Sequence, residues 1–244
     1  MTWAFVGNLG GTGNGVSSTT VSFATSGSSA PVGSVVIARV ASDNINTTDG
    51  DFSEVVSVQD STGGNAWAKI AEFTNGQAGA AAGCTVSVWM AHVGTEIPSG
   101  ATIQATFSSA VTAKAITADR FSIAAGNFPQ LAGPVQTLAD DAAAPGEMTI
   151  SGLPSREYLF IRALAGETTL LSFEESPDWI DLKSFDYDGG PAAASMGVAG
   201  EYEIATGTGI TSAPIEDTAT EWASVLFALV EVLPTSTLFF GAGP

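Results

Sequence analysis

The chain has very few of the residues that most catalytic and metal sites require. Its 244 residues include one cysteine, Cys84, and one histidine, His92. A single cysteine excludes an intrachain disulfide and any site built from several thiolates, and a single histidine excludes sites that need two imidazoles. Cys84 begins a strand-like segment and His92 lies near its end. We therefore expect a buried thiol and an imidazole at the surface or at a sheet edge.

Basic side chains are also scarce. The chain has 7 Lys and Arg residues against 25 Asp and Glu residues, and its formal net charge is −18. A chain of this charge lacks the cationic surface that phosphate backbones and anionic lipids attract, so we expect no nucleic-acid partner and no membrane partner. Met1–Gly7 has no basic segment followed by an apolar run, and no stretch is apolar for long enough to span a bilayer. We expect a protein made in the cytoplasm without a signal peptide.

Alternation of apolar and polar residues is the dominant pattern in the chain. A period of two predicts strands, and clusters of Gly, Pro, Asn and Ser between them predict turns. The clearest strand predictions are Val35–Val40, Thr85–Met90, Thr102–Phe107, Tyr158–Arg162 and Ser224–Val230. Convincing amphipathic helices are missing. These features predict an all-β fold, specifically a jelly-roll-like antiparallel β-sandwich.

The two halves of the sequence echo each other in the order of their strand-like segments. We interpret residues 16–125 and 147–232 as two similar half-units of about four strands each, joined by a crossover at 126–146. Loose self-similarity is common in all-β chains, so a chance likeness is the alternative. Residues 1–232 then form a single domain. The glycine-rich segment Gly7–Gly15 is predicted to be a flexible loop.

Residues 233–244 form an apolar tail after the last predicted strand. Pro234 ends that strand, and Leu238, Phe239 and Phe240 follow it. Two adjacent phenylalanines are costly to leave in water. Two interpretations stay open: the tail folds back onto its own sheet edge, or it docks on a neighbouring subunit and serves assembly.

Chemistry-bearing motifs are nearly absent, and we assign no catalytic, cofactor-binding or metal-binding residue. There is no G-x-S-x-G nucleophile motif, and nothing in the sequence selects two of the acidic residues as a glycosidase pair. Two acidic loops that contain glycine, 43–51 and 186–189, offer oxygen ligands to calcium. Solvated turns are the default interpretation of both loops.

Two tryptophans are candidates for a glycan-facing surface. Trp67 lies beside Asn65, and Trp179 lies beside Asp178. Aromatic rings next to amide or acidic side chains are typical of sugar-binding faces. Packing in the core is the alternative interpretation for both rings, because aromatic side chains favour burial.

One series of segments resembles a known module. Asp60-Ser61-Thr62-Gly63-Gly64-Asn65-Ala66-Trp67, followed by Ser87–Ala91 and Ile97–Ile103, resembles a β-sandwich module of tailed-bacteriophage virion proteins and some bacterial surface proteins. Ser176–Trp179 and Trp222–Phe227 are similar to the later part of that module. The resemblance covers about residues 15–232. Its motifs are turn and strand signatures, so it bears on fold and context and assigns no catalytic residue.

The resemblance implies a non-enzymatic structural protein of a tailed-phage virion, exposed on the head as a fibre, spike or decoration subunit. It implies a homo-oligomer that attaches to other virion proteins, such as the major capsid protein, and that contacts host surface polysaccharide. The alternatives are a tail fibre or receptor-binding protein, a carbohydrate-binding or less readily a glycan-cleaving module, and a surface adhesin exported without a classical signal.

Overall fold

The structure is a computed structural model that describes residues 3–77, 79, 82–140, 146–168, 178–190, 195–212 and 221–234. Within these ranges the chain forms fifteen strands and no helix. The strands pair antiparallel in every sheet. The predicted all-β, antiparallel sandwich is therefore confirmed. It has more strands and more layers than the two four-stranded half-units that the sequence indicated.

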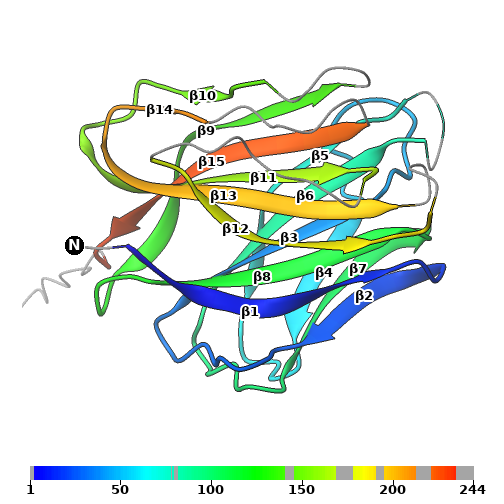
Figure 1. Ribbon diagram of the computed structural model, residues 1–244. Helices are drawn as coiled ribbons and strands as arrows, with labels where there is room; N and C mark the ends of the chain where they lie inside the picture. Colours follow the sequence, from blue (N-terminus) through cyan, green and yellow to red (C-terminus); the bar gives the residue numbers. More distant parts are fainter. Residues whose placement is uncertain are drawn as a thin grey trace, which may run out of the picture.

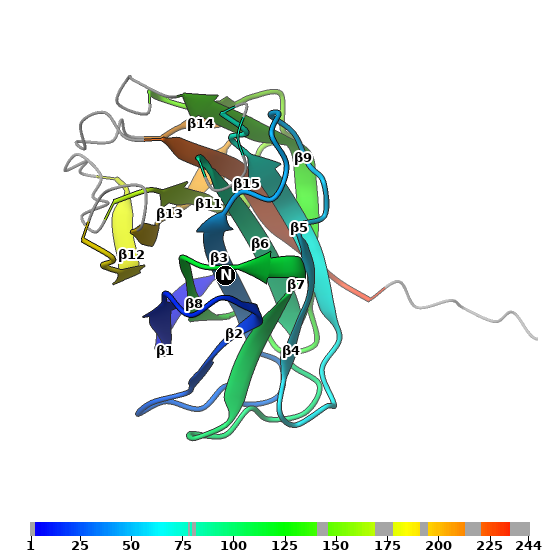
Figure 2. The same ribbon diagram turned by 90° about the vertical axis from the view of Figure 1, so that its right-hand side faces the viewer.

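Three main sheets are stacked face to face (Figures 1 and 2). The central sheet has the order β1-β8-β3-β6-β5, with bounds Ala4–Asn14, Lys114–Ser122, Val35–Asp43, Cys84–His92 and Trp67–Thr74. The second sheet has the order β12-β13-β11-β15-β9, with bounds Ile180–Tyr187, Met196–Gly207, Arg156–Gly166, Trp222–Val232 and Phe128–Asp140. The cover sheet has the order β2-β7-β4, with bounds Ser18–Ala24, Thr102–Val111 and Val55–Asp60. A two-stranded sheet of β10 (Thr149–Ile150) and β14 (Ile210–Thr211) lies outside the second sheet.

The central sheet is buried on both faces, which explains its unusually apolar strands. All nine residues of β3 are buried. One face, with Ile37 and Val86, packs against the second sheet through residues such as Ile161 and Phe227. The other face packs against the cover sheet. A strand covered on both sides has no polar face, so Val35–Val40 is a nearly continuous apolar run rather than a strict alternation.

The two halves of the chain have the same strand order. Read from one edge, the central sheet runs β1-β8-β3-β6-β5, and the second sheet read likewise runs β9-β15-β11-β13-β12. The first, middle and last strands of each half occupy equivalent places. The pair β2–β7 in the first half corresponds to β10–β14 in the second, whereas the described residues contain no counterpart of β4. This match supports the interpretation of two half-units, with each half forming one main sheet and its outer layer.

The limits of the two half-units differ from the predicted ones. The predicted crossover, 126–146, contains β9, which is a 13-residue edge strand paired with β15. In the sequence this segment resembled a loop because it contains Pro129, Gly133 and Pro134. An edge strand tolerates proline because one side of its backbone needs no partner. The first half also begins before residue 16, because β1 is its edge strand.

The glycine-rich start is a strand and not the flexible loop that the sequence indicated. Residues of β1 pair with β8 along its whole length. A Cβ atom at Gly13 would lie 1.9 Å from the carbonyl oxygen of Asp186, and one at Gly11 would lie 2.5 Å from the ring of Phe185. The glycines therefore let β12, an edge strand of the second sheet, approach β1 closely. Their role here is close packing and not flexibility.

Candidate functional site

The segment that carries the resemblance is a turn organised around one buried carboxylate. Asp60 is 5% exposed. Its carboxylate accepts hydrogen bonds from Thr62 (backbone N, 3.0 Å, and its hydroxyl), from Asn65 Nδ2 (3.1 Å) and from Trp67 Nε1 (3.0 Å). Burial alone raises the pKa of Asp60, but these hydrogen bonds outweigh it and leave the pKa below its ordinary value. The motif residues thus bind one another and hold the β4–β5 turn.

Asn65 extends this turn to a second loop. Its Oδ1 accepts hydrogen bonds from the backbone N–H groups of Gly94 and Thr95, each at 2.9 Å, and its Nδ2 donates to the Thr95 carbonyl at 2.9 Å. Trp67 is half-buried and packs at the margin of the core between the central and cover sheets. The amide of Asn65 and the indole N–H of Trp67 are both engaged within the chain, which favours a structural role for the motif.

Replacing Asp60 with asparagine is expected to lower the free energy of unfolding by about 2 kcal/mol, because a charge-assisted acceptor of several half-buried donors is lost. The low pKa of folded Asp60 stabilises the native state above the pKa of the unfolded carboxyl, and this contribution is lost as the pH falls. The difference in the free energy of unfolding between wild type and Asp60→Asn should therefore become smaller under acidic conditions. Urea titrations at pH 7 and pH 3.5 measure both effects. Asp178→Asn, at an exposed site, is the control and should change stability by less than about 0.5 kcal/mol.

Trp179, the second glycan-facing candidate, is buried. It is 7% exposed, and its Nε1 donates to the Thr211 carbonyl at 3.1 Å. It belongs to the core beneath β10 and β14, on the opposite side of the stack from Trp67. The two tryptophans do not share a face, and Trp179 has no ring surface to offer a sugar. The sequence could not show that Trp179 is buried, because its burial depends on the layer of β10 and β14 that covers it.

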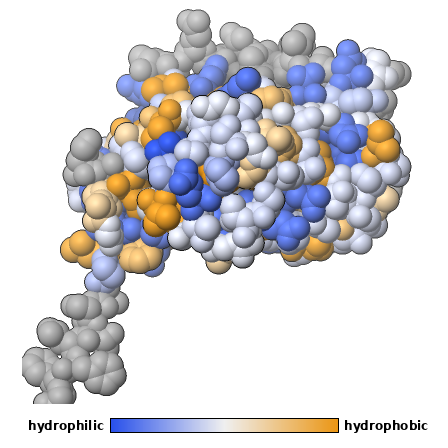
Figure 3. All heavy atoms as spheres, turned by 90° about the horizontal axis from the view of Figure 1, so that it is seen from below, coloured by the Kyte–Doolittle hydropathy of each residue, from blue (hydrophilic) through white to orange (hydrophobic). Residues whose placement is uncertain are grey.

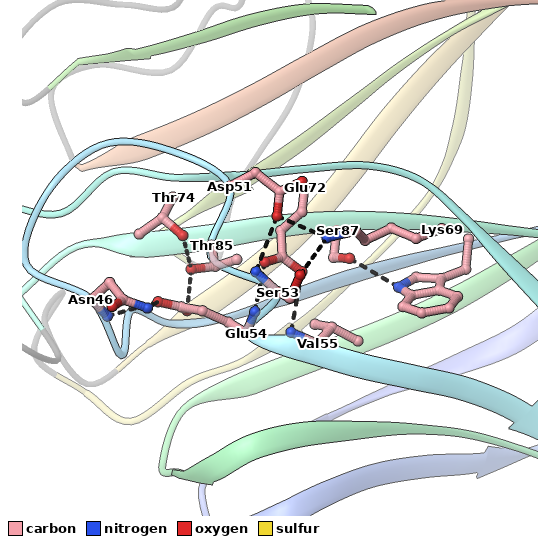
Figure 4. A network of polar contacts seen from close by, with 11 residues as sticks. Asn46, Asp51, Ser53, Glu54, Val55, Lys69, Glu72, Thr74, Thr85 and Ser87 are labelled. Carbon is pink, nitrogen blue, oxygen red and sulfur yellow. Dashed lines mark hydrogen bonds and ion pairs between the residues drawn. The ribbon is translucent and has the colours of Figure 1, made fainter.

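The predicted calcium loop at 43–51 is held by polar contacts within the chain (Figure 4). Glu54, fully buried, accepts hydrogen bonds from the backbone N–H groups of Ile45 and Asn46 and from the hydroxyl of Thr85. Glu72, 2% exposed, accepts from the backbone N–H groups of Glu54 and Val55. These two carboxylates fix the loop onto the central sheet and do not face a cleft.

The oxygen atoms expected to bind calcium have partners of their own. Asp51 pairs with Lys69 at 2.7 Å, and Asp49 accepts from the backbone N–H of Gly76 at 3.0 Å. Asp188, in the second predicted loop, accepts from the backbone N–H of Gly190 at 2.8 Å. Over the described ranges no group of three or more His, Cys, Asp or Glu side chains is arranged to hold a metal ion. The partners of loop 43–51 come from β5 and the residues just after it, whereas the partner of Asp188 is two residues away in the same turn.

A carboxyl group is buried where the central and second sheets meet at one end. Glu167 is 2% exposed, and its backbone N–H donates to the carbonyl of Glu221 at 3.0 Å, so the two residues face each other across strands. Burial, the carboxylate of Glu221 and the charge of Asp43 raise the pKa of Glu167 to about 8. The same groups surround Cys84, where burial first and then these acids raise the thiol pKa. The buried thiol expected for Cys84 is confirmed.

Stability should fall as the pH rises from about 4.5 to about 8, because native Glu167 keeps a proton that the unfolded chain releases. Glu167→Gln should remove part of this dependence and raise the melting temperature at pH 8.5 by roughly 5 °C. Scanning calorimetry at pH 5 and pH 8.5 measures the difference. Glu96→Gln removes one charge from an exposed site and should leave the pH dependence unchanged. Equal slopes for wild type and Glu167→Gln would contradict the assignment.

Reasoning from the sequence did not predict that charged residues lie inside the core. Arg39 and Asp119, both fully buried, form an ion pair of 2.7 Å between the central and second sheets. Arg162 is fully buried on the outer face of the second sheet, 3.9 Å from Glu201. A signal was present, since each arginine interrupts an otherwise apolar run of residues. A lone cation in such a run needs a buried partner, but the partner's position cannot be read from the sequence.

The outer face of the cover sheet is an array of uncharged polar side chains. Cross-strand pairing aligns Thr20 with Thr106 and Ser57, and Ser22 with Gln104 and Gln59. The residues between them on β7, Ile103, Ala105 and Phe107, point inward. A hollow of about 180 Å³ lies on this face between Gln59, Asp60, Ser61, Thr102 and Gln104. Figure 3 shows this side of the molecule as mostly pale, the colour of intermediate hydropathy.

Apolar side chains gather at one end of the molecule. Val32, Phe128 and Leu233 are 66%, 45% and 76% exposed, and we call these three residues the apolar end. The ring of Phe128 lies 4.8 Å from that of His92, and Phe128 pairs with Val232 in the second sheet. Figure 3 shows the concentration of apolar residues at its left, the end at which β15 finishes in Figure 1. His92 is the last residue of β6, an inner strand of the central sheet, and it is half-buried with its Nε2 shielded from solvent, so the expected position at the surface or at a sheet edge is wrong.

The proposed assembly residues Leu238, Phe239 and Phe240 lie outside the described residues. Among those that are described, no helix is long and apolar enough to cross a bilayer. Comparisons of the chain with protein-family models, with curated proteins and with solved structures gave no match.

Proposed function

We propose that the chain is a non-enzymatic structural protein of a tailed-phage virion, exposed on the head as a fibre, spike or decoration subunit. The observation that carries the proposal is the Asp60 turn. The residues that resemble the phage module, Asp60, Asn65 and Trp67, are joined by hydrogen bonds to one another and to a neighbouring loop. Residues whose side chains hold the fold together are what we expect of a motif in a structural protein.

The distribution of basic residues also supports work outside the cell, where proteases are present. Trypsin cleaves after Lys and Arg, and the chain has 7 of them. Arg39, Lys114 and Arg162 are fully buried. The Lys114 ammonium donates to the carbonyls of Val16 and Val111. A stack of sheets with so few accessible cleavage sites resists digestion as long as it stays folded.

Association with particles tests the proposal. An antibody against the purified chain should label phage particles from the producing culture at regularly spaced positions in electron micrographs, and the chain should sediment with the particle band in a density gradient. An antibody to the major capsid protein serves as the positive control. Recovery of the whole chain in the soluble fraction, with an unlabelled particle band, would contradict a virion role.

A second candidate function, contact with host surface polysaccharide, is favoured by the outer face of the cover sheet. Hydroxyl and amide groups both donate and accept, as sugar hydroxyls do. The side chains of this array are uncharged, and Asp60 is the one acidic residue among those that line the hollow. Titration with neutral oligosaccharides, followed by the amide signals of β7, tests this role. Gln104→Glu places a charge in the hollow and should abolish binding, whereas Thr19→Glu, beside the array at an exposed site of β2, should not.

A further inference from the structure

One end of the core between the central and second sheets carries polar groups that can ionise. Asp43, the last residue of β3, follows Ala41 by two residues and pairs in register with Cys84, the first residue of β6. Ala41 and Cys84 belong to the core between the two sheets. Because alternate residues of a strand share a face, Asp43 points toward the second sheet as well. The thiol of Cys84 reaches that sheet and donates to the Ala165 carbonyl at 3.4 Å.

Two further acids face this pair from the second sheet. Glu167 follows β11 and Glu221 precedes β15, and the 3.0 Å hydrogen bond between their backbones continues the β11–β15 ladder by one residue pair. Ala165 and Ala223, two residues from each, point into the same core, so alternation turns both carboxyl groups inward. Glu167 is 2% exposed and Glu221 is half-buried. Their side chains are joined by a hydrogen bond, which requires that one of the two carboxyl groups holds a proton.

The described residues provide no cation that pairs with these acids. None of the ion pairs between described residues includes Asp43, Glu167 or Glu221. Oδ1 of Asp43 and Oε1 of Glu167 are buried and accept no hydrogen bond. Lys114 in β8 favours the charged form of Asp43, but its ammonium donates to backbone carbonyls. Asp140, at the end of β9, is exposed. The shared proton is therefore what limits repulsion among the three buried or half-buried carboxyl groups.

We propose that Asp43, Cys84, Glu167 and Glu221 form a pH-sensitive switch, which is closed while Glu167 and Glu221 share a proton and opens this end of the core when that proton is lost to water. Without the proton, two negative charges face each other where water is largely excluded, and their repulsion is strong. The ends of β11 and β15 then separate from those of β3 and β6, and Cys84 becomes accessible. The pKa of Glu167, raised to about 8 by burial and by its acidic neighbours, places the opening at mildly alkaline pH. This inference is independent of the proposed virion role.

Alkylation of Cys84 by iodoacetamide measures the opening, because the chain contains one cysteine. Dividing the rate by that of the urea-unfolded chain at the same pH removes the ionisation of the thiol itself and leaves a degree of protection. Between pH 6 and pH 8 this protection should fall at least about 10-fold, since opening releases a proton. In Glu167→Gln it should change less than about 3-fold, because the amide has no proton to release. A wild-type protection that is equal at both pH values, or a Glu167→Gln variant that follows wild type, would overturn the proposal.

A second thiol position separates local opening from unfolding of the whole domain. Val35, fully buried at the other end of β3, lies on the same face of the central sheet. In Cys84→Ala/Val35→Cys the thiol should be at least about 10-fold better protected at pH 8 than Cys84 is in wild type, because only global unfolding exposes it. Low concentrations of urea should accelerate labelling at position 35 and leave labelling at Cys84 nearly unchanged.

Equal protection at the two positions would mean that global unfolding alone exposes Cys84, which would contradict the switch. Far-UV circular dichroism verifies that each variant is folded. If Glu167→Gln fails to fold, Glu221→Gln removes the other member of the pair and should show the same loss of pH dependence.

Discussion

Replacing Asp119 with alanine is expected to lower the free energy of unfolding by about 3–5 kcal/mol, because it leaves the guanidinium of Arg39 unpaired in the core. Both side chains are fully buried, and Nη2 of Arg39 lies 2.7 Å from Oδ2 of Asp119. Asp119 also accepts a hydrogen bond from Asn8 Nδ2 at 2.9 Å. The same Arg39 nitrogen donates to the Lys183 carbonyl at 3.1 Å, in β12 of the second sheet. The pair therefore joins the two halves of the chain.

Urea unfolding followed by tryptophan fluorescence measures this loss. Asp51→Ala removes the acid of an exposed ion pair with Lys69, also 2.7 Å long, and should cost less than about 1 kcal/mol. The double variant Arg39→Met/Asp119→Leu removes both charges and should recover much of the stability lost in Asp119→Ala. If Asp119→Ala cost no more than Asp51→Ala, the pair would not hold the interface between the sheets.

Replacing Gly13 with alanine should destabilise the fold by roughly 3 kcal/mol, because the added methyl group has no space. Its Cβ would lie 1.9 Å from the carbonyl oxygen and 2.2 Å from the carbonyl carbon of Asp186, and backbone atoms cannot rotate away as a side chain can. The β1 and β12 edges would have to separate. This would open the core between the central and second sheets to water.

Gly146→Ala is the matched control, since a Cβ there meets nothing within 4 Å and the residue is exposed. It should change stability by less than about 0.5 kcal/mol. Hydrogen exchange locates the damage in Gly13→Ala: the amides of β1 and β12 should lose protection before those of β11 and β15. Equal stability of the two glycine variants would show that β1 and β12 do not pack as closely as described.

Much of the fold can be predicted from local patterns in the sequence. Segments such as Thr102–Phe107 alternate because one face of the cover sheet packs on the core and the other meets solvent. The Asp60 turn is also local, because its donors lie within seven residues of the carboxylate. The sequence could not place Trp179, since its burial depends on β14, whose Thr211 lies 32 residues away. It also could not reveal the uncharged face, which needs the register of three strands.

The sequence by itself determined the β-character and local turns such as the one at Asp60, because each depends on residues close together in the chain. Tertiary structure alone decided the roles of residues whose partners are distant. Glycines that locally indicate flexibility form β1, since β12 fills the space that side chains would occupy. Arg39 lies in the core because Asp119, 80 residues further along, reaches it there. Burial and charge pairing depend on neighbours in space, and antiparallel stacking brings those neighbours from far along the chain.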